Sequence, residues 1–439
     1  MLNKSDNYQL VCGLEIHAEL KTKSKMFCGC KNDPFSASTP NIYTCPVCLG
    51  MPGGLPVANK KAIEWTIKLG LALGCKINLF SKFDRKHYFY PDLPKGYQIS
   101  QYDLPFCYEG KIDTSFGPVR ITRIHLEEDT GKLLHKKIDG QEVSLIDFNR
   151  SSVPLIEIVS EPDIKSGEMA KEYAKNLRAI IKYLDIADCD MDQGGMRLEA
   201  NISLTTNPNK LPAYKVEVKN INSFRFVEQA IAFEMKRQQE ILEAGETPAQ
   251  ETRGFNPNTG KTFSQRSKED AADYRYFPDP DLPPFRFTQA QIEAWRSELP
   301  ELPAAIVKRW QEKFGIEPRY AQVLFKSKTK AALLDELWTL AKEQAPKLAN
   351  LLANKKIKLG KTALATWNDF QKANTTEQID TSELEKVIAQ VLASNAEAVT
   401  RYQGGQTQLL NFFLGQTMKA LGKKVDVKQV LEHLSLALS

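Results

Sequence analysis

Long apolar runs are missing from this sequence of 439 residues, and none approaches the roughly 18 residues that a membrane-spanning helix requires. Residues 1–6 have neither the apolar centre of a signal peptide nor an Arg-rich amphipathic pattern. Eight cysteines in so long a chain do not suggest a secreted disulfide scaffold. We therefore expect a cytoplasmic protein with no membrane partner.

The usual nucleotide-binding motifs are also missing. Gly260-Lys261-Thr262 matches the end of a P-loop, but Gly254 lies one position too early to supply its first glycine. We find no dinucleotide-binding fingerprint, no protein-kinase catalytic loop and no nucleophile elbow. If the protein uses ATP, we expect ATP to bind on a sheet that carries acidic metal ligands.

Composition and charge set only broad limits. The 59 basic and 54 acidic residues give a formal net charge of +5, which is compatible with RNA binding but is not evidence for it. A hydrophobic content of 42% is typical of a globular protein, and 439 residues are too many for one ordinary core. We expect two or three domains.

The order of strand and helix patterns indicates an α+β region followed by a helical region. Before about residue 290, strand patterns alternate with helices that should begin after three capping residues, Asn59, Ser166 and Ser223. The proline-rich residues 279–284 can continue neither a helix nor a central strand. Beyond them the periodicity is helical, with a break expected around residues 372–382.

Five segments alternate like strands with one apolar and one ionisable face. Successive side chains of a strand point to opposite faces, so residues two apart share a surface. The segments are residues 12–20, 120–129, 155–161, 196–204 and 215–219. Their polar faces carry Glu15, His17 and Glu19; His125, Glu127 and Asp129; Glu157; Arg197, Glu199, Asn201 and Ser203; and Lys215, Glu217 and Lys219.

An antiparallel sheet with one solvated face is the simplest explanation of this pattern. These faces, however, are rich in carboxylates and His, whereas an ordinary solvated face favours Thr, Ser and Lys. Such groups suit hard cations and polyphosphate chemistry. The pattern favours a metal or phosphate site and leaves the plain solvated sheet open as the alternative.

Four cysteines form two close pairs, Cys28-Gly29-Cys30 and Cys45-Pro46-Val47-Cys48, whereas the other four occur singly. Two close pairs on turns are the usual way to assemble a tetrahedral four-thiolate zinc site. Such a site leaves no position for a reacting water, so we expect a structural Zn²⁺. Four unrelated buried cysteines are the weaker alternative.

Basic and aromatic residues are interleaved in residues 83–92, and aromatics flank Arg275 in residues 273–278. Such segments can hold a nucleotide or unpaired RNA bases. Aromatics packed in a core beside solvated charges explain them at least as well. The polar turn at residues 149–154, which precedes the Glu157 strand, is equally undiagnostic.

Long strings of the chain carry a resemblance to a known family. They are residues 13–20, 83–92, 97–101, 125–129, 154–164, 219–224, 250–253, 273–284 and 413–419. In this order they resemble the B subunit of the bacterial and organellar aspartyl/glutamyl-tRNA amidotransferases. The chain departs from the family's pattern at Leu198 and Glu199, which stand where a cysteine and an aspartate are common, and in the region between about 316 and 380, which is shorter than in typical members and matches poorly.

The resemblance implies an α+β fold in three parts. Residues 1–290 would form a cradle domain with a mainly antiparallel, glutamine synthetase-like catalytic sheet and a zinc-binding insertion at residues 28–48. Residues 291–378 would form a helical domain, and residues 379–439 a small helical tail that binds tRNA.

The resemblance also implies a reaction. The cradle would use ATP and Mg²⁺ to phosphorylate the side-chain carboxylate of glutamate or aspartate misacylated on tRNA. Ammonia released from glutamine by the A subunit would then displace the phosphate, giving Gln-tRNA(Gln) or Asn-tRNA(Asn). A C subunit would tie A and B together.

Candidate site residues follow from that chemistry and from the polar faces. The expected Mg²⁺ ligands are Glu15, His17 and Glu127, and weaker catalytic candidates are Glu128, Asp129 and Glu157. Glu128 falls on the opposite face in the strand register. The candidates for contact with phosphate or substrate are Arg85, Lys86, Arg150, Arg197, Glu199 and Lys219.

Two other classes of function fit less well. A non-enzymatic RNA-binding scaffold would not need the ionisable groups at Glu15, His17, Glu127 and Asp129. A metal-dependent phosphoryl-transfer enzyme acting on a small amino acid would not need the helical tail.

Overall fold

A computed structural model describes residues 8–207, 209–267, 274–325, 327–374, 379–423 and 425–438. Asp273 of the aromatic segment and part of the expected break, residues 375–378, lie outside the described residues. The chain divides into two compact units, Met1–Ile306 and Val307–Ser439. Each unit is described by itself below.

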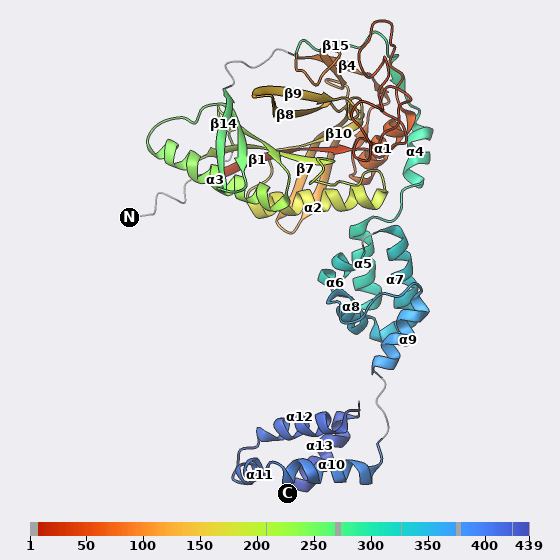
Figure 1. The fold of residues 1–439 in the computed structure, drawn as a ribbon, viewed down its shortest axis with the longest axis vertical. Helices are drawn as coiled ribbons and strands as arrows, with labels where there is room; N and C mark the ends of the chain where they lie inside the picture. Colours follow the sequence, from red (N-terminus) through yellow and green to blue (C-terminus); the bar gives the residue numbers. More distant parts are fainter. Residues whose placement is uncertain are drawn as a thin grey trace. The chain divides into compact units, whose positions relative to one another are not determined.

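The first unit is built on one large sheet (Figure 1). Among the described residues, nine strands lie in the order β14-β13-β12-β11-β1-β10-β7-β6-β2. Their bounds are β14 Lys261–Ser267, β13 Glu251–Asn256, β12 Val216–Ile221, β11 Met196–Thr205, β1 Gln9–Glu19, β10 Pro154–Ser160, β7 Gly117–Glu128, β6 Cys107–Thr114 and β2 Lys76–Ile77. All neighbours pair antiparallel except β12 and β13, which are parallel. The prediction of a mainly antiparallel α+β fold is confirmed.

Strand β1 lies near the middle of the sheet and shows the predicted alternation. Its even-numbered residues, Leu10 to Ala18, are buried in the main apolar core, whereas Glu15 and His17 are only partly buried on the other face. Burying an aliphatic side chain of this size contributes about 1.5–3 kcal/mol, so one face of β1 is fixed toward the core. The opposite face is thereby left to the ionisable groups.

Three helices supply the other half of that core: α1 (Lys60–Ala72), α2 (Gly167–Leu184) and α3 (Phe224–Glu243). Figure 1 shows α2 and α3 running beneath the sheet. Each begins after a predicted cap, because the side chains of Asn59, Ser166 and Ser223 accept hydrogen bonds from backbone N–H groups of the first turn. The three predicted helix starts are confirmed.

Smaller elements complete the first unit. A three-stranded sheet has the order β15-β4-β5, with bounds Phe277–Pro278, Asp84–His87 and Tyr97–Ser100. Strands β16 (Phe285–Arg286) and β3 (Phe80–Ser81) pair, as do β8 (Lys132–Ile138) and β9 (Gln141–Asp147). Helix α4 (Gln289–Ser297) begins with the predicted capping box of Thr288 and Gln291.

The second unit is helical in its described residues. Its helices are α5 (Pro303–Phe314, which begins in the first unit), α6 (Pro318–Leu324), α7 (Lys328–Ala341), η3 (Lys342–Gln344), α8 (Ala345–Ala353), α9 (Ala363–Asn374), α10 (Thr381–Ala393), α11 (Ala396–Gln403), α12 (Leu409–Leu421) and α13 (Val427–Leu438). The buried rings of Trp310 and Trp338 meet edge to face at 5.7 Å. Residues from Ile379 to Leu438 share a separate apolar cluster around Phe413 and Leu434.

Candidate functional site: an ionisable row across the main sheet

Four ionisable side chains form a row across neighbouring strands of the main sheet. Arg197 on β11 pairs in register with His17 on β1, His17 with Glu157 on β10, and Glu157 with His125 on β7. Opposite residues of an antiparallel pair lie side by side on one face. The row therefore gathers residues that are far apart in the sequence.

A compact metal-ligand-like cluster joins two residues of this row, His17 and Glu157, with Glu127 on β7. His17 Nε2 is 3.3 Å from Glu157 Oε2 and 3.8 Å from Glu127 Oε1. One ligand atom from each of these three residues lies within 4.8 Å of the others. His125 Nε2 also approaches Glu157 Oε2, at 3.2 Å, and Ser100 Oγ donates to Glu127 Oε2. An imidazole and two carboxylates, held this way, can bind a divalent cation.

The His17 and Glu157 side chains shift one another's pKa in opposite directions. Burial opposes protonation of His17, but the carboxylate of Glu157 outweighs it and raises the His17 pKa to about 9. Burial would raise the pKa of Glu157, yet the two histidines hold it well below its usual range. A cation bound at this cluster would compete with the proton on His17.

A second cluster of three carboxylates lies further along β1 and β11. Glu15 faces Glu199 in register, and Glu217 on β12 completes the group, with oxygens within 4.8 Å of one another. Lys219 Nζ lies 3.1 Å from Glu199 Oε2 and 3.5 Å from Glu217 Oε1. Burial, followed by repulsion from Glu157 and Glu199, raises the pKa of Glu15. An all-oxygen set of this kind fits the ligand preference of Mg²⁺.

The predicted Mg²⁺ ligand set is divided between these two clusters. Glu15 joins Glu199 and Glu217, whereas His17 and Glu127 join Glu157. All of these residues lie on the same face of adjacent strands, and repulsion from Glu157 contributes to the raised pKa of Glu15. The two clusters are neighbours on one surface.

Asp129 does not belong to either cluster but anchors two arginines. Arg197 Nη2 lies 2.8 Å from Asp129 Oδ2, and Arg150 Nε lies 3.9 Å from Asp129 Oδ1. Burial would raise the pKa of Asp129, but Arg197 and Arg150 hold it far below its usual range. The pKa of buried Glu19 is raised well above its usual range, first by burial and then by Asp129. Asp129 therefore positions the two arginines.

Three other candidates occupy different surroundings. Glu128 lies on the opposite face, as the register predicted, where Lys95 Nζ and the Ile99 N–H donate to its Oε1. Arg85 is committed to Asp279 and Asp281, at 2.8 and 2.9 Å. Burial would lower the pKa of Lys86, but the negative charges of Glu127 and Glu157 outweigh it and raise that pKa. Lys86 is thus within electrostatic reach of the first cluster.

The four paired cysteines converge. One sulfur from each of Cys28, Cys30, Cys45 and Cys48 lies within 4.8 Å of the others. Cys48 Sγ also accepts from the Cys45 N–H at 3.1 Å and from Lys25 Nζ at 3.8 Å. A hydrogen bond from Cys28, together with nearby Lys25, lowers the pKa of Cys48 to about 5. A cluster of thiols that favours a thiolate suits a tetrahedral Zn²⁺.

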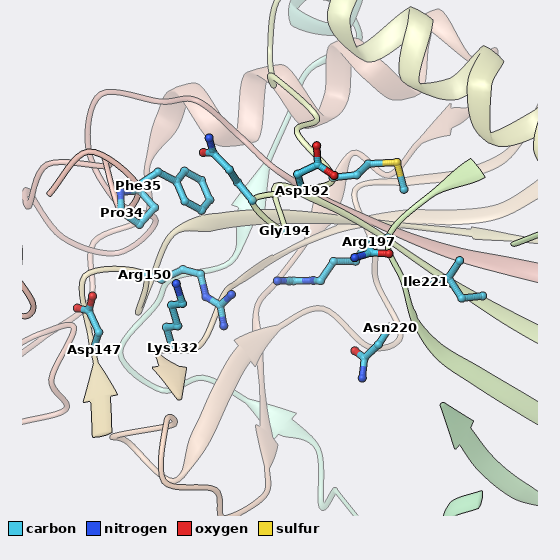
Figure 2. Close-up of a pocket in the computed structure, with 13 residues that line it drawn as sticks. Pro34, Phe35, Lys132, Asp147, Arg150, Asp192, Gly194, Arg197, Asn220 and Ile221 are labelled. Atoms are coloured by element: carbon cyan, nitrogen blue, oxygen red, sulfur yellow. The ribbon is translucent and has the colours of Figure 1, made fainter. Parts of the chain in front are cut away.

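A pocket of about 590 Å³ opens beside the row at Arg197. Figure 2 shows Arg150 and Arg197 extending toward one another in it, with Pro34 and Phe35 on another wall. Lys132, Asn220 and Asn222 also line it. The pocket lining contains none of the six residues of the two metal-ligand-like clusters.

Three residues to which the sequence analysis gave no role lie at this site: His125, Glu217 and Glu19. The only sign of them in the sequence was the alternation of apolar and polar residues, which placed each of the three on the polar face of its strand. Alternation does not tell which residue of a neighbouring strand stands opposite. That information came from the register, which sets His125 beside Glu157 and Glu217 beside Asn201.

Comparison with known proteins defines the class of this sheet and its helical extension. Residues 10–293 match the model of the GatB/GatE catalytic domain, and residues 326–438 match that of the GatB domain. Together the matches cover most of the chain. The chain belongs to the GatB family of amidotransferase subunits, and the predictions of the family and of a ligase-type enzyme subunit are confirmed.

Individual relatives cover the chain almost from end to end. The chain is 40% identical to the B subunit of the aspartyl/glutamyl-tRNA(Asn/Gln) amidotransferase of Thermomicrobium roseum, with 95% of this chain and 96% of the relative aligned. It is 42% identical to the protein of the same name from Thermodesulfovibrio yellowstonii, over 97% and 98% of the two chains. These relatives are named as subunits, so the family works in multi-subunit complexes. Among the described residues, no helix has the length and apolar character needed to cross a bilayer.

Proposed function

We propose that this chain is the kinase subunit of a tRNA-dependent amidotransferase. With ATP and Mg²⁺ it phosphorylates the side-chain carboxylate of Glu-tRNA(Gln), Asp-tRNA(Asn) or both. Ammonia from a glutaminase A subunit then displaces phosphate to give the amide, and a C subunit joins A to B. Because its product feeds translation, we place the protein in the cytoplasm.

The chemistry explains the need for such a surface. A carboxylate resists attack by ammonia because its oxygen is a poor leaving group, and phosphorylation supplies a good one. Phosphoryl transfer depends mainly on positioning and charge neutralisation. The observation that carries the proposal is the pair of neighbouring acidic clusters on one sheet face, in a chain without a P-loop.

Different residues of the two clusters would bind the cations and neutralise the charge of the phosphates. His17, Glu127 and Glu157 would hold one cation, and Glu15, Glu199 and Glu217 a second. The bound Mg²⁺ would neutralise phosphate oxygens and orient the γ-phosphoryl group. Lys219, which lies against Glu199 and Glu217, and Lys86, whose raised pKa reflects Glu127 and Glu157, would place positive charge beside the transferring group.

Two further parts of the proposal concern other regions. The Cys28–Cys30–Cys45–Cys48 cluster would hold a structural Zn²⁺, because four thiols complete a tetrahedron and leave no open position. The helices between Thr381 and Leu438, with their own apolar cluster, would form a tail that binds tRNA.

The test uses the reconstituted complex with its A and C subunits. The Glu157→Gln variant keeps the size of the side chain but removes the charge shared by His17 and His125. We expect amide formation on misacylated tRNA to fall at least about 100-fold, while glutamine hydrolysis by the A subunit persists. Glu161→Gln, just beyond the same strand, is the matched control, since the Glu161 side chain accepts a hydrogen bond from Thr122 Oγ1 and belongs to neither cluster. Normal amide formation by Glu157→Gln would reject the proposal.

A further inference from the structure

Lys25 is a completely buried lysine whose ammonium group lies beside the four-cysteine cluster. A lysine is almost never buried to this degree unless its charge is compensated. The ammonium has three N–H donors, and three acceptors surround it: the carbonyls of Tyr43 and Phe148, at 2.6 and 3.2 Å, and Cys48 Sγ, at 3.8 Å. The two carbonyls are neutral, so Cys48 is the acceptor of these three that can carry negative charge as a metal ligand.

The contact falls on the one cysteine of the cluster that water does not reach. Cys48 is buried, whereas Cys28, Cys30 and Cys45 are partly exposed. Four thiolates around one Zn²⁺ leave a net negative charge, and burying a charge is costly unless an opposite charge or hydrogen bonds compensate it. Solvent can compensate the three partly exposed sulfurs. Lys25 supplies the fixed positive charge at the buried one.

The same ammonium also holds a loop between β9 and β10. We call residues 148–152 the bridging loop, and the carbonyl of its first residue accepts from the buried ammonium. Ser151 Oγ donates to the Cys48 carbonyl at 2.9 Å. The side-chain amide of Asn149 makes two more hydrogen bonds, at 2.8 and 2.9 Å, with backbone atoms of residues 39–43. The bridging loop is therefore tied to the cysteine-bearing segment at several points.

The other side of the bridging loop holds the chain just beyond β7. The Ser152 N–H donates to the Asp129 carbonyl at 2.9 Å. Arg150 Nε and Nη2 donate to the carbonyls of the next two residues, at 3.0 and 2.8 Å. Asp129 directly follows β7, the strand that carries Glu127 of the first metal-ligand-like cluster. One short loop thus connects the cysteines with the end of a strand of the candidate site.

Ser152 shows that the bridging loop is held under strain. Its φ of 68° lies in the left-handed region, which costs a residue other than glycine about 1–3 kcal/mol. Both of its peptide groups are fixed, because its N–H bonds to Asp129 and its carbonyl accepts from the N–H of Met26 at 2.6 Å. Met26 directly follows Lys25, so the strained conformation depends on contacts from the side of the cysteines.

We propose that Lys25 is a positioning residue that couples metal loading of the cysteine cluster to the order of the bridging loop, and through that loop to Arg150 and Asp129. With the metal bound, the cluster fixes the ammonium, and the ammonium fixes the first carbonyl of the loop. Loss of the metal lets the four sulfurs move apart, and the ammonium then loses its fixed partner. The inference rests on the zinc site of the proposed function and is independent of the phosphoryl-transfer step.

Hydrogen exchange of the full chain, followed by mass spectrometry, measures the order of the bridging loop. The Ser151 and Ser152 N–H groups both donate to backbone carbonyls, so both should exchange slowly in the zinc-loaded wild type. We expect exchange of the loop to become at least about tenfold faster in the metal-free wild type and in zinc-loaded Lys25→Met. Lys23→Met, which changes an exposed lysine two residues earlier, should match the wild type. Unchanged exchange in either altered protein would overturn the inference.

Co²⁺ substitution distinguishes this coupling from a simple loss of packing. The sulfur-to-Co²⁺ charge-transfer band reports the charge around the thiolates, because a nearby cation stabilises the sulfur electrons and moves the band to higher energy. The band should therefore move to lower energy in Lys25→Met, move less in Lys25→Arg, and stay in place in Lys23→Met. The affinity for Zn²⁺ should also fall about 10–100-fold in Lys25→Met, as is usual when a partner of a metal ligand is removed.

The outcomes separate this inference from the zinc site on which it rests. The same charge-transfer band in Lys25→Met and wild type would overturn the inference and leave the zinc site intact. A wild-type chain that binds no zinc would reject the zinc site and this inference with it. Where Lys25→Met does not fold, Lys25→Arg and the comparison of zinc-loaded with metal-free wild type decide the question.

Discussion

His17 and Glu157 face one another across β1 and β10, with Nε2 and Oε2 3.3 Å apart. His17 is partly buried, whereas Glu157 is buried with Glu127 and His125, and the His17–Glu157 pair lies in the middle of the ionisable row. A protonated imidazole between two carboxylates occupies the place that a cation would take. We therefore expect cation binding at this cluster to compete with protonation of His17.

Glu15→Gln should remove ATP-dependent amide formation in the reconstituted complex. The variant deletes one of three carboxylates from the second cluster while Asn201 can still hydrogen-bond to residue 15. Glutamine hydrolysis by the A subunit should largely persist. Glu109→Gln, which changes an exposed partner of Lys76, should behave as the wild type. Undiminished product from Glu15→Gln would remove Glu15 from the site.

Glu199→Asp should raise the Mg²⁺ concentration needed for half-maximal amide formation. Shortening the side chain by one methylene moves its oxygens away from Lys219 and from the Glu15–Glu217 pair. Glu199→Gln should raise that concentration further, because it removes the charge. The measurement is a Mg²⁺ titration at fixed ATP. If all three proteins share one half-maximal concentration, Glu199 does not hold the cation.

Arg197→Gln should destabilise the first unit by about 3 kcal/mol at pH 7, because it leaves the buried Asp129 carboxylate with a weaker partner. In the wild type the depressed pKa of Asp129 stabilises the fold above the unfolded pKa of about 4, and that stabilisation is lost as the pH falls. The difference between variant and wild type should therefore persist from pH 7 to about pH 4 and shrink as the pH falls below about 4. Urea unfolding at pH 7 and at a pH of about 3 measures it.

Arg120→Gln provides the comparison for that experiment. Arg120 pairs with Asp163 on the surface, with 66% of its side chain exposed, so its loss should cost at most about 1 kcal/mol. A loss in Arg197→Gln no larger than in Arg120→Gln would show that Asp129 does not depend on Arg197.

The purified chain should bind about one Zn²⁺, and Cys45→Ser should lose it. The four sulfurs are already gathered, so removal of one thiolate leaves an incomplete tetrahedron. Cys189→Ser, a buried single cysteine outside the cluster, should keep its metal. Elemental analysis measures both proteins, and less than about half an equivalent in the wild type would reject the structural site.

The sequence predicts the features of this site that depend on neighbours within one strand, but not those that depend on the pairing of different strands. Alternation with period two is local, and it correctly placed Glu15 and His17 on one face of β1 and Glu128 on the other face of β7. The register between strands is not local. It separates Glu15 from His17 into different clusters and brings His125 to Glu157, which no spacing within one strand could reveal.

The pocket was beyond sequence reasoning for the same reason. Phe35, Lys132, Arg150, Arg197 and Asn220 come from five separate segments that meet only after the sheet and its loops are folded. Arg85 is a residue that the sequence analysis proposed for phosphate binding and that the fold uses otherwise. Its guanidinium donates hydrogen bonds to Asp279 and Asp281, which lie almost two hundred residues later in the sequence.

The central claim, phosphorylation of an aminoacyl side chain on this sheet, is tested most directly by following the γ-phosphate. The complete complex is given γ-labelled ATP and misacylated tRNA, without glutamine or ammonia, and the aminoacyl-tRNA is isolated rapidly. We predict label on the amino acid attached to tRNA for the wild type and none for Glu157→Gln. Amide formation on addition of glutamine, with no label ever transferred to aminoacyl-tRNA, would contradict the claim.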